Sequence, residues 1–151
     1  MAVDPVPTGY HSVTPYLIVD NAAAAIDFYR EAFGAVEVFR LTMGDKIGHA
    51  EIRIGDSPVM LADEFPDTDY LGPNRRGGTS VQLMIYLADV ELACERAIRA
   101  GATEHRPVQD HFYGDRSGTV IDPFGHQWTL STHVEDVTPD EMQRRMATEP
   151  A

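Results

Sequence analysis

The sequence predicts an α+β protein made of two tandem βαβββ modules, and three observations lead to this prediction. A strand pattern is followed by an amphipathic helix twice along the chain. The two helices end in similar sequences, Phe33-Gly34-Ala35 and Ala100-Gly101-Ala102. Three further strand patterns follow each helix, so the order β-α-β-β-β occurs twice, and a repeated supersecondary unit predicts a repeated architecture.

The first module is expected over residues 13–63, after an extended arm at 1–12 that contains prolines and a glycine. Asp20 and Asn21 can cap its helix, and Gly34 can end it. The turn signals Gly44-Asp45 and Gly55-Asp56 separate its later strands. The expected elements are a strand at 13–19, a helix at 22–33, and strands at 35–41, 49–54 and 59–62.

The second module is expected over residues 80–133, after a polar linker at 64–79 that either connects the modules or forms a flap over a cavity. Asp89 can cap its helix, and residues 122–125 form a turn. The expected elements are a strand at 80–87, a helix at 89–100, and strands at 104–111, 116–121 and 127–132. In the tail at 134–151, a capping box at 138–141 predicts a short C-terminal helix that covers a sheet edge or reaches a partner subunit.

Composition narrows the classes of partner. The chain has 151 residues, 43% of them apolar, and a formal net charge of −12. This balance argues against binding to nucleic acid or to an anionic membrane surface. A single cysteine, Cys94, excludes an internal disulfide, and its helical surroundings indicate a packed small side chain. The sequence contains neither a signal peptide pattern nor an apolar run of about 18 residues, so we expect a cytoplasmic protein.

Several segments resemble a known family. Residues 13–21 (VTPYLIVDN), 25–29 (AIDFY) and 33–35 (FGA) resemble the first module of the vicinal oxygen chelate superfamily, which includes glyoxalase I, bleomycin-resistance proteins and extradiol dioxygenases. Residues 122–130 (DPFGHQWTL) resemble its terminal strand signature. Three shorter segments are similar to a phosphonate-operon-associated glyoxalase-like branch, namely 48–54, 60–63 and 112–116. The resemblance implies mixed half-sheets that curl around a cavity, helices outside them, and homodimeric assembly.

Alternation along the strands predicts which side chains face this cavity, because successive residues of a strand point to opposite sides. In the first module the inward set is Thr14, Tyr16, His49, Glu51, Arg53 and Met60, and in the second it is Gln82, Met84, Tyr86 and Thr129. Arg116 is a further candidate that either holds an anionic group of a ligand or pairs with Asp115 or Asp122, and Tyr113 could gate the cavity mouth. His105, His111 and His133 are expected at the surface.

The resemblance also implies where a metal would be held in metal-bearing relatives. Those four positions correspond here to Thr14, Met60, Gln82 and Thr129. Divalent ions of this class prefer imidazole or carboxylate ligands, so we expect no metal at these positions. An unconventional site, built from His49 and Glu51 with His126 approaching, remains an alternative.

Three functions are compatible with these residues. The first is metal-free binding of a small organic molecule of the bleomycin-resistance type, in a cavity lined by apolar and polar side chains. The second is a lyase, isomerase or dioxygenase-type enzyme for a small metabolite, with His49 and Glu51 as acid–base groups and with or without a divalent metal. The third is a non-catalytic dimeric scaffold.

Overall fold

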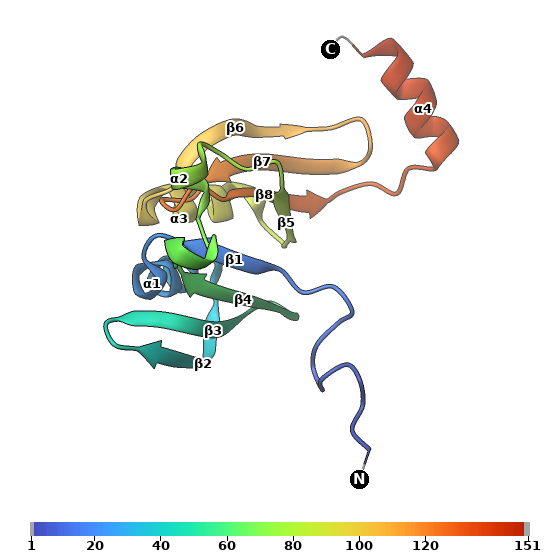
Figure 1. The fold of residues 1–151 in the computed structure, drawn as a ribbon. Coiled ribbons are helices and arrows are strands. Elements are labelled where there is room, and N and C mark those ends of the chain that lie inside the picture. Colours follow the sequence, from blue (N-terminus) through green and yellow to red (C-terminus); the bar gives the residue numbers. More distant parts are fainter. Residues whose placement is uncertain (1, 150–151) are drawn as a thin grey trace. The chain divides into compact units, whose positions relative to one another are not determined.

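The computed structural model describes residues 2–149 (Figure 1). Internal contacts divide the described chain into two compact units. The first unit contains residues 2–79 together with the turn 123–125, and the second contains residues 80–122 together with 126–149. Each unit contains one four-stranded mixed sheet and one helix between the first two strands of that sheet.

In the first unit the strands lie in the order β1-β4-β3-β2. β1 is parallel to β4, and the other neighbouring strands are antiparallel. Its elements are β1 (Tyr16–Val19), α1 (Ala22–Phe33), β2 (Val36–Met43), β3 (Lys46–Ile54) and β4 (Ser57–Asp63), followed by the short helices η1 (Pro66–Thr68) and α2 (Pro73–Arg76).

The second unit repeats this order as β5-β8-β7-β6, with β5 parallel to β8. Its elements are β5 (Gln82–Tyr86), α3 (Val90–Ala100), β6 (Thr103–Asp110), β7 (Asp115–Ile121), β8 (Gln127–His133) and α4 (Pro139–Thr148). The predicted fold class, two βαβββ sets with outer helices and a short C-terminal helix, is confirmed.

The helix ends form as the sequence predicts. The Asn21 side chain accepts a hydrogen bond from the Ala24 amide, and Asp89 accepts one from the Leu92 amide, so both carboxamide and carboxylate act as N-caps. Gly34 ends α1 in the left-handed conformation at φ 69°, which glycine adopts without a steric penalty. These caps fix where each helix joins its sheet.

One face of each sheet packs against its helix, as alternation predicts. Leu61 and Leu130 occupy matching places in β4 and β8 and are fully buried. Alternation also predicts that Val13 and Val81 pack against the helices, which is wrong, since both residues precede the strands and are exposed. β1 begins at Tyr16 rather than at Val13, because Pro15 has no amide hydrogen to donate to the ladder and only accepts from the Met60 amide.

The turn between β7 and β8 explains part of the terminal strand signature. The buried Asp122 carboxylate accepts from the His126 amide at 2.9 Å and from the Trp128 indole nitrogen at 2.8 Å. Asp122 therefore closes the turn and fixes Trp128 at the start of β8. The residues of this signature thus form a turn that is closed by local hydrogen bonds.

Two segments differ in detail from expectation. The predicted linker contains η1 and α2, and the buried Glu64 carboxylate accepts from the Gly72 amide at 2.8 Å, which orders the segment. α4 buries none of its side chains and stands away from its sheet in Figure 1, so it does not cover an edge of the second unit. Arg145 holds it by donating to the Phe112 carbonyl and pairing with Glu135.

Among residues 2–149, no helix has the length and apolarity needed to cross a bilayer.

Candidate functional site

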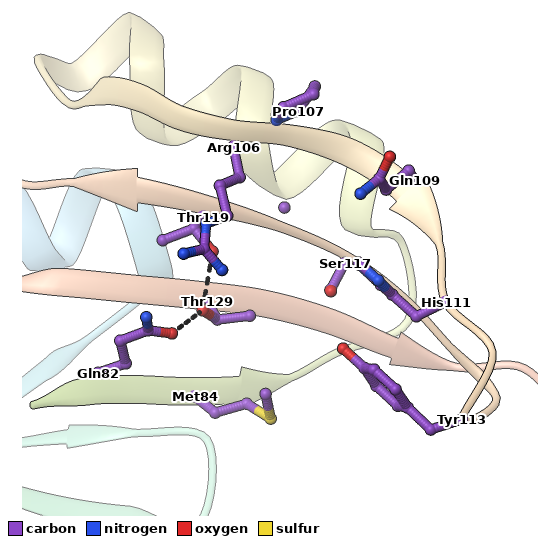
Figure 2. Close-up of a pocket in the computed structure, with 11 residues that line it drawn as sticks. Gln82, Met84, Arg106, Pro107, Gln109, His111, Tyr113, Ser117, Thr119 and Thr129 are labelled. Atoms are coloured by element: carbon purple, nitrogen blue, oxygen red, sulfur yellow. Dashed lines mark hydrogen bonds between the residues drawn. The ribbon is translucent and has the colours of Figure 1, made fainter. Parts of the chain in front are cut away.

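The second unit contains a pocket of about 110 Å³ on the face of its sheet that lies opposite α3 (Figure 2). Side chains from β5, β6, β7 and β8, and from the β6–β7 loop, surround it. The eleven lining residues are Gln82, Met84, Arg106, Pro107, Gln109, His111, Tyr113, Ser117, Gly118, Thr119 and Thr129.

Three polar side chains form a connected floor. Strand pairing sets Thr119 on β7 directly opposite Thr129 on β8, and their hydroxyl oxygens lie 2.9 Å apart. The Thr129 hydroxyl donates to Gln82 Oε1 at 3.1 Å. Because a hydroxyl carries one hydrogen, Thr119 is then the donor to Thr129. The chain of bonds holds all three groups in place at the base of the pocket.

The rim combines flat rings, a thioether and a cation. The rings of His111 and Tyr113 stack with centroids 5.1 Å apart and an interplanar angle of 10°. Met84 contributes an adaptable apolar wall. In Figure 2 the Arg106 side chain extends from β6 toward Thr119. The pocket therefore offers stacking, apolar contact and hydrogen-bond donors to one small group.

The corresponding face of the first unit carries a hydrogen-bonded chain instead. Tyr16 Oη lies 2.9 Å from His49 Nδ1, and His49 Nε2 lies 3.0 Å from Glu51 Oε1. Since a carboxylate oxygen accepts, His49 Nε2 is the donor to Glu51, and in a neutral imidazole Nδ1 then accepts from the Tyr16 hydroxyl. Partial burial raises the pKa of Tyr16, and Tyr70 raises it further. The chain runs from an exposed phenol to the buried Glu51 carboxylate.

The structure brings together some of the residues singled out in the sequence. Gln82, Met84, Tyr113 and Thr129 share the pocket of the second unit. Met60 pairs in register with both Tyr16 and Glu51, so it belongs to the same face as the Tyr16–His49–Glu51 chain.

Thr14 and Arg116 lie elsewhere, whereas Arg53 follows Glu51 by two residues on β3 and therefore belongs to the same face of the sheet. The Thr14 hydroxyl donates to the His11 carbonyl at 3.4 Å, within the N-terminal arm. The N-terminal arm also lies close to the Arg53 guanidinium, since a Cβ added to Gly9 would lie 3.4 Å from Arg53 Nη2.

Arg116 pairs with Glu91 and Asp110 rather than with Asp115 or Asp122. On β7 it alternates with the pocket residues Ser117 and Thr119, and therefore points toward α3.

Other pocket residues were missed from the sequence, namely Arg106, Pro107, Gln109, Ser117, Gly118 and Thr119. His111, which the sequence placed only at the surface, is half-buried and lines the pocket as well. Pairing of residues 116–121 with the last strand could have identified Ser117 and Thr119, which face the pocket beside Thr129.

Cys94 is buried in α3, and burial raises the pKa of its thiol to about 11, with smaller contributions from Glu104 and Glu91. A thiol in this state is a packed side chain rather than a nucleophile, as the sequence predicts.

The residues at the metal-ligand positions do not fit a divalent ion. The Gln82 and Thr129 side chains are hydrogen-bonded to each other, and the Thr14 hydroxyl is hydrogen-bonded to the N-terminal arm. Threonine hydroxyls and a thioether lack the imidazole or carboxylate donors that such an ion prefers. Within residues 2–149 no group of three or more His, Cys, Asp or Glu side chains is arranged so that it could hold a metal ion.

Comparison with known proteins gives consistent matches over most of the chain. A family model described as Glyoxalase/Bleomycin resistance protein/Dioxygenase superfamily matches residues 9–130. An uncharacterized protein of Mycobacterium bovis is 42% identical over 142 residues, which cover 91% of this chain and 93% of the relative. An uncharacterized protein of Mycobacterium tuberculosis has the same identity over 91% of this chain and 84% of its own length.

Solved structures agree with these matches. TioX from Micromonospora sp. ML1 aligns with a TM-score of 0.64 and 26% identity, over 85% of this chain and 100% of its own. The fosfomycin resistance protein FosX from Mesorhizobium loti aligns with a TM-score of 0.62 and 18% identity, over 88% of this chain and 97% of its own. At that identity the second likeness concerns the fold alone.

Proposed function

The chain belongs to the glyoxalase/bleomycin resistance protein/dioxygenase superfamily, and from this premise we propose that it binds a small organic molecule without a metal ion. The binding site in this proposal is the pocket of the second unit. The observation that carries it is the connected floor of Thr119, Thr129 and Gln82 beneath a rim of Met84 and stacked rings. Apolar walls with a few fixed polar groups are typical of small-molecule sites.

The donor chemistry supports the metal-free part of the proposal. In this chain the positions that hold metal in other members carry two threonines, a methionine and a glutamine. A ligand would then be held by direct hydrogen bonds and apolar contact. The likeness to the phosphonate-operon-associated branch and the cavity shared by both modules stay predictions.

Native mass spectrometry of protein purified without chelator and without affinity metal tests this proposal. We expect a bound small molecule that remains after chelator treatment. Met84→Trp fills the pocket from an exposed position, so it should abolish binding while the protein stays folded. Met43→Trp, at an exposed site on β2 of the first unit, is the matched control and should retain the ligand. A stoichiometric divalent ion, or equal binding by Met84→Trp, would contradict the proposal.

A second candidate function is acid–base catalysis in the first unit, and the Tyr16–His49–Glu51 chain favours it. A phenol backed by an imidazole and a buried carboxylate can pass a proton in either direction. Exchange of solvent deuterium into hydroxyacetone, followed by NMR, tests this candidate. His49→Gln and Tyr16→Phe should each abolish exchange without loss of folding, whereas Met43→Trp should not. Absence of exchange in the wild type would remove the candidate for this class of carbonyl compound.

The proposal also includes a cytoplasmic location and a homodimer. The single cysteine suits a reducing compartment. The edge strand β2 exposes Val36, Val38, Phe39, Leu41 and Met43, and an exposed apolar edge favours association. Sedimentation of the purified protein measures the assembly, and a monomer at all concentrations would contradict it. A pure scaffold, in contrast, would give neither bound ligand nor exchange.

A further inference from the structure

The pocket of the second unit lacks acidic side chains. Its eleven lining residues include an arginine and a histidine but no aspartate or glutamate. The chain as a whole has 24 acidic residues and 12 lysines and arginines. The net charge of the pocket lining is therefore opposite in sign to that of the whole protein. This difference lowers the electrostatic cost of binding an anion in the pocket.

Arg106 supplies a positive charge that the protein does not neutralise by direct contact. Elsewhere in the second unit, Arg116 pairs with Glu91 and Asp110, and Arg145 pairs with Glu135 and Glu141. Within residues 2–149, Arg106 makes neither an ion pair nor a side-chain hydrogen bond. A guanidinium has five N–H donors and no acceptor, so its remaining partners are water or a ligand with oxygen acceptors.

The floor adds further donors. Gln82 Oε1 is occupied by the Thr129 hydroxyl, while the Gln82 amide nitrogen donates to no group among the described residues. The Ser117 hydroxyl also lines the pocket and makes no side-chain hydrogen bond within residues 2–149. Arg106 on the rim and these two groups on the floor are all able to donate to one bound group.

The size of the pocket indicates which part of a ligand it holds. Its volume of about 110 Å³ is well below the roughly 300–1,000 Å³ of sites that enclose a whole drug-sized molecule. It suits one compact head group. Several unpaired donors, a net positive lining and this small volume together match a carboxylate, phosphonate or phosphate group.

We propose that this pocket binds the oxyanion group of its ligand, with Arg106 as the charged anchor and Gln82 and Ser117 as neutral donors. The inference rests on the proposed function, since it names the chemical class that the proposed site recognises. Arg106 takes the role that the sequence suggested for Arg116, whose guanidinium is held by two carboxylates on the other side of the sheet.

Amide NMR titrations at constant ionic strength test the inference with three probes. Methylphosphonate and acetate represent the two kinds of oxyanion, and acetamide is the neutral comparison. We expect at least one anion to shift the amides of Ser117, Thr119 and Thr129 with saturation, and acetamide to bind more weakly. The stronger anion identifies phosphonate-like or carboxylate-like recognition.

Arg106→Gln should weaken binding of that anion about ten- to a hundredfold, because it removes a charge-assisted hydrogen bond. Arg106→Lys keeps the charge and should lose less. Arg116→Gln removes the same charge from the opposite face of the sheet and should bind like the wild type. The amide spectrum of each variant reports whether it is folded.

The outcomes separate the two proposals. If a co-purified ligand or acetamide saturates the pocket amides while neither anion does, the proposed function stands and the oxyanion inference is wrong. Equal weakening by Arg106→Gln and Arg116→Gln would also overturn it, because that result reflects overall charge. If neither a ligand nor any probe perturbs the pocket, both proposals fail.

Discussion

The two units have the same strand order but differ on the sheet face opposite the helix. Toward the helix, Leu61 lies between Leu17 and Ala50 in the first sheet, as Leu130 lies between Ile85 and Gly118 in the second. On the opposite face, the first unit joins its polar groups into the Tyr16–His49–Glu51 chain, whereas the second leaves donors unpaired around a pocket. Packing constrains one face of each sheet, and the other is free to acquire different chemistry.

The edge strands differ as well. β2 presents large apolar side chains to solvent and contains no proline. β6 is polar, contains Pro107 and departs from regular register at Arg106. Proline, charge and bulges are devices that discourage edge-to-edge pairing of strands. Both edge strands contain charged residues and register shifts, but only β6 also contains a proline, and β6 forms part of the rim of the pocket.

Corresponding glycines give the largest expected difference between the units. Gly44 and Gly114 both have positive φ in the turn that follows the edge strand. A Cβ on Gly44 would meet nothing within 4 Å, but on Gly114 it would lie 2.1 Å from the Glu135 carbonyl oxygen. The Gly114 carbonyl also accepts from the Val134 and Glu135 amides.

Gly114→Ala should therefore reduce the free energy of unfolding by roughly 3–5 kcal/mol, since left-handed strain adds to a backbone collision and two weakened hydrogen bonds. Gly44→Ala should cost only about 1 kcal/mol, from strain alone. Urea denaturation of both variants measures the difference. Equal losses would mean that segment 134–135 is not held against the turn as described.

A smaller difference is expected inside the sheets. Gly118 takes the place that Ala50 has in the first unit, and a Cβ there would lie 2.9 Å from Val108 Cγ2 and 3.2 Å from Cys94 Sγ. Its φ is not positive, so the cost of Gly118→Ala is overpacking alone, about 1–3 kcal/mol in unfolding free energy.

Val108→Ala should recover part of the loss caused by Gly118→Ala, because it removes the methyl group that the new Cβ meets. A double-mutant cycle by urea denaturation measures this coupling. Strict additivity of the two changes would refute the close approach of β6 to β7 at this point.

The repeated fold could be predicted from the sequence because its signals are local. The ends of helices and the turns are marked in the sequence by the N-caps Asn21 and Asp89 and by Gly34, Gly44 and Gly55. Strand alternation predicts that Leu61 and Leu130 face the helices. Such signals depend on neighbours only a few residues away.

The site was predicted less completely because its geometry is not local. The β6 residues Arg106 and Gln109, with His111 just beyond, all reach the pocket, although their spacing is not that of a regular strand. Register shifts between Glu104 and Arg106, and between Arg106 and Gln109, break the period of two on which the sequence argument depends. The partners of Arg116 likewise come from α3 and β6, which no spacing in the sequence reveals.

The smallest expected difference concerns pH and the second unit's own histidine network. His133 lies between two carboxylates, with Nδ1 2.8 Å from Asp115 Oδ1 and Nε2 2.7 Å from Asp136 Oδ1. Tyr86 donates to the other oxygen of Asp115. His49, in contrast, lies between a phenol and one carboxylate. The hydrogen bond to Asp115, followed by that to Asp136, raises the pKa of His133.

A raised pKa in the folded state means that the folded protein holds the proton more tightly than the unfolded chain. The stabilisation is complete below the unfolded pKa of about 6.5 and is lost as the pH rises through the folded value. His133→Gln should therefore reduce the fall in the urea midpoint between about pH 6 and about pH 9. Asp136→Asn should reduce it partly, whereas Asp140→Asn, which removes the same charge without touching His133, should leave it as in the wild type. A wild-type slope in His133→Gln would show that this network does not couple protonation to folding, and the two units would then differ in packing and pocket chemistry but not in their response to pH.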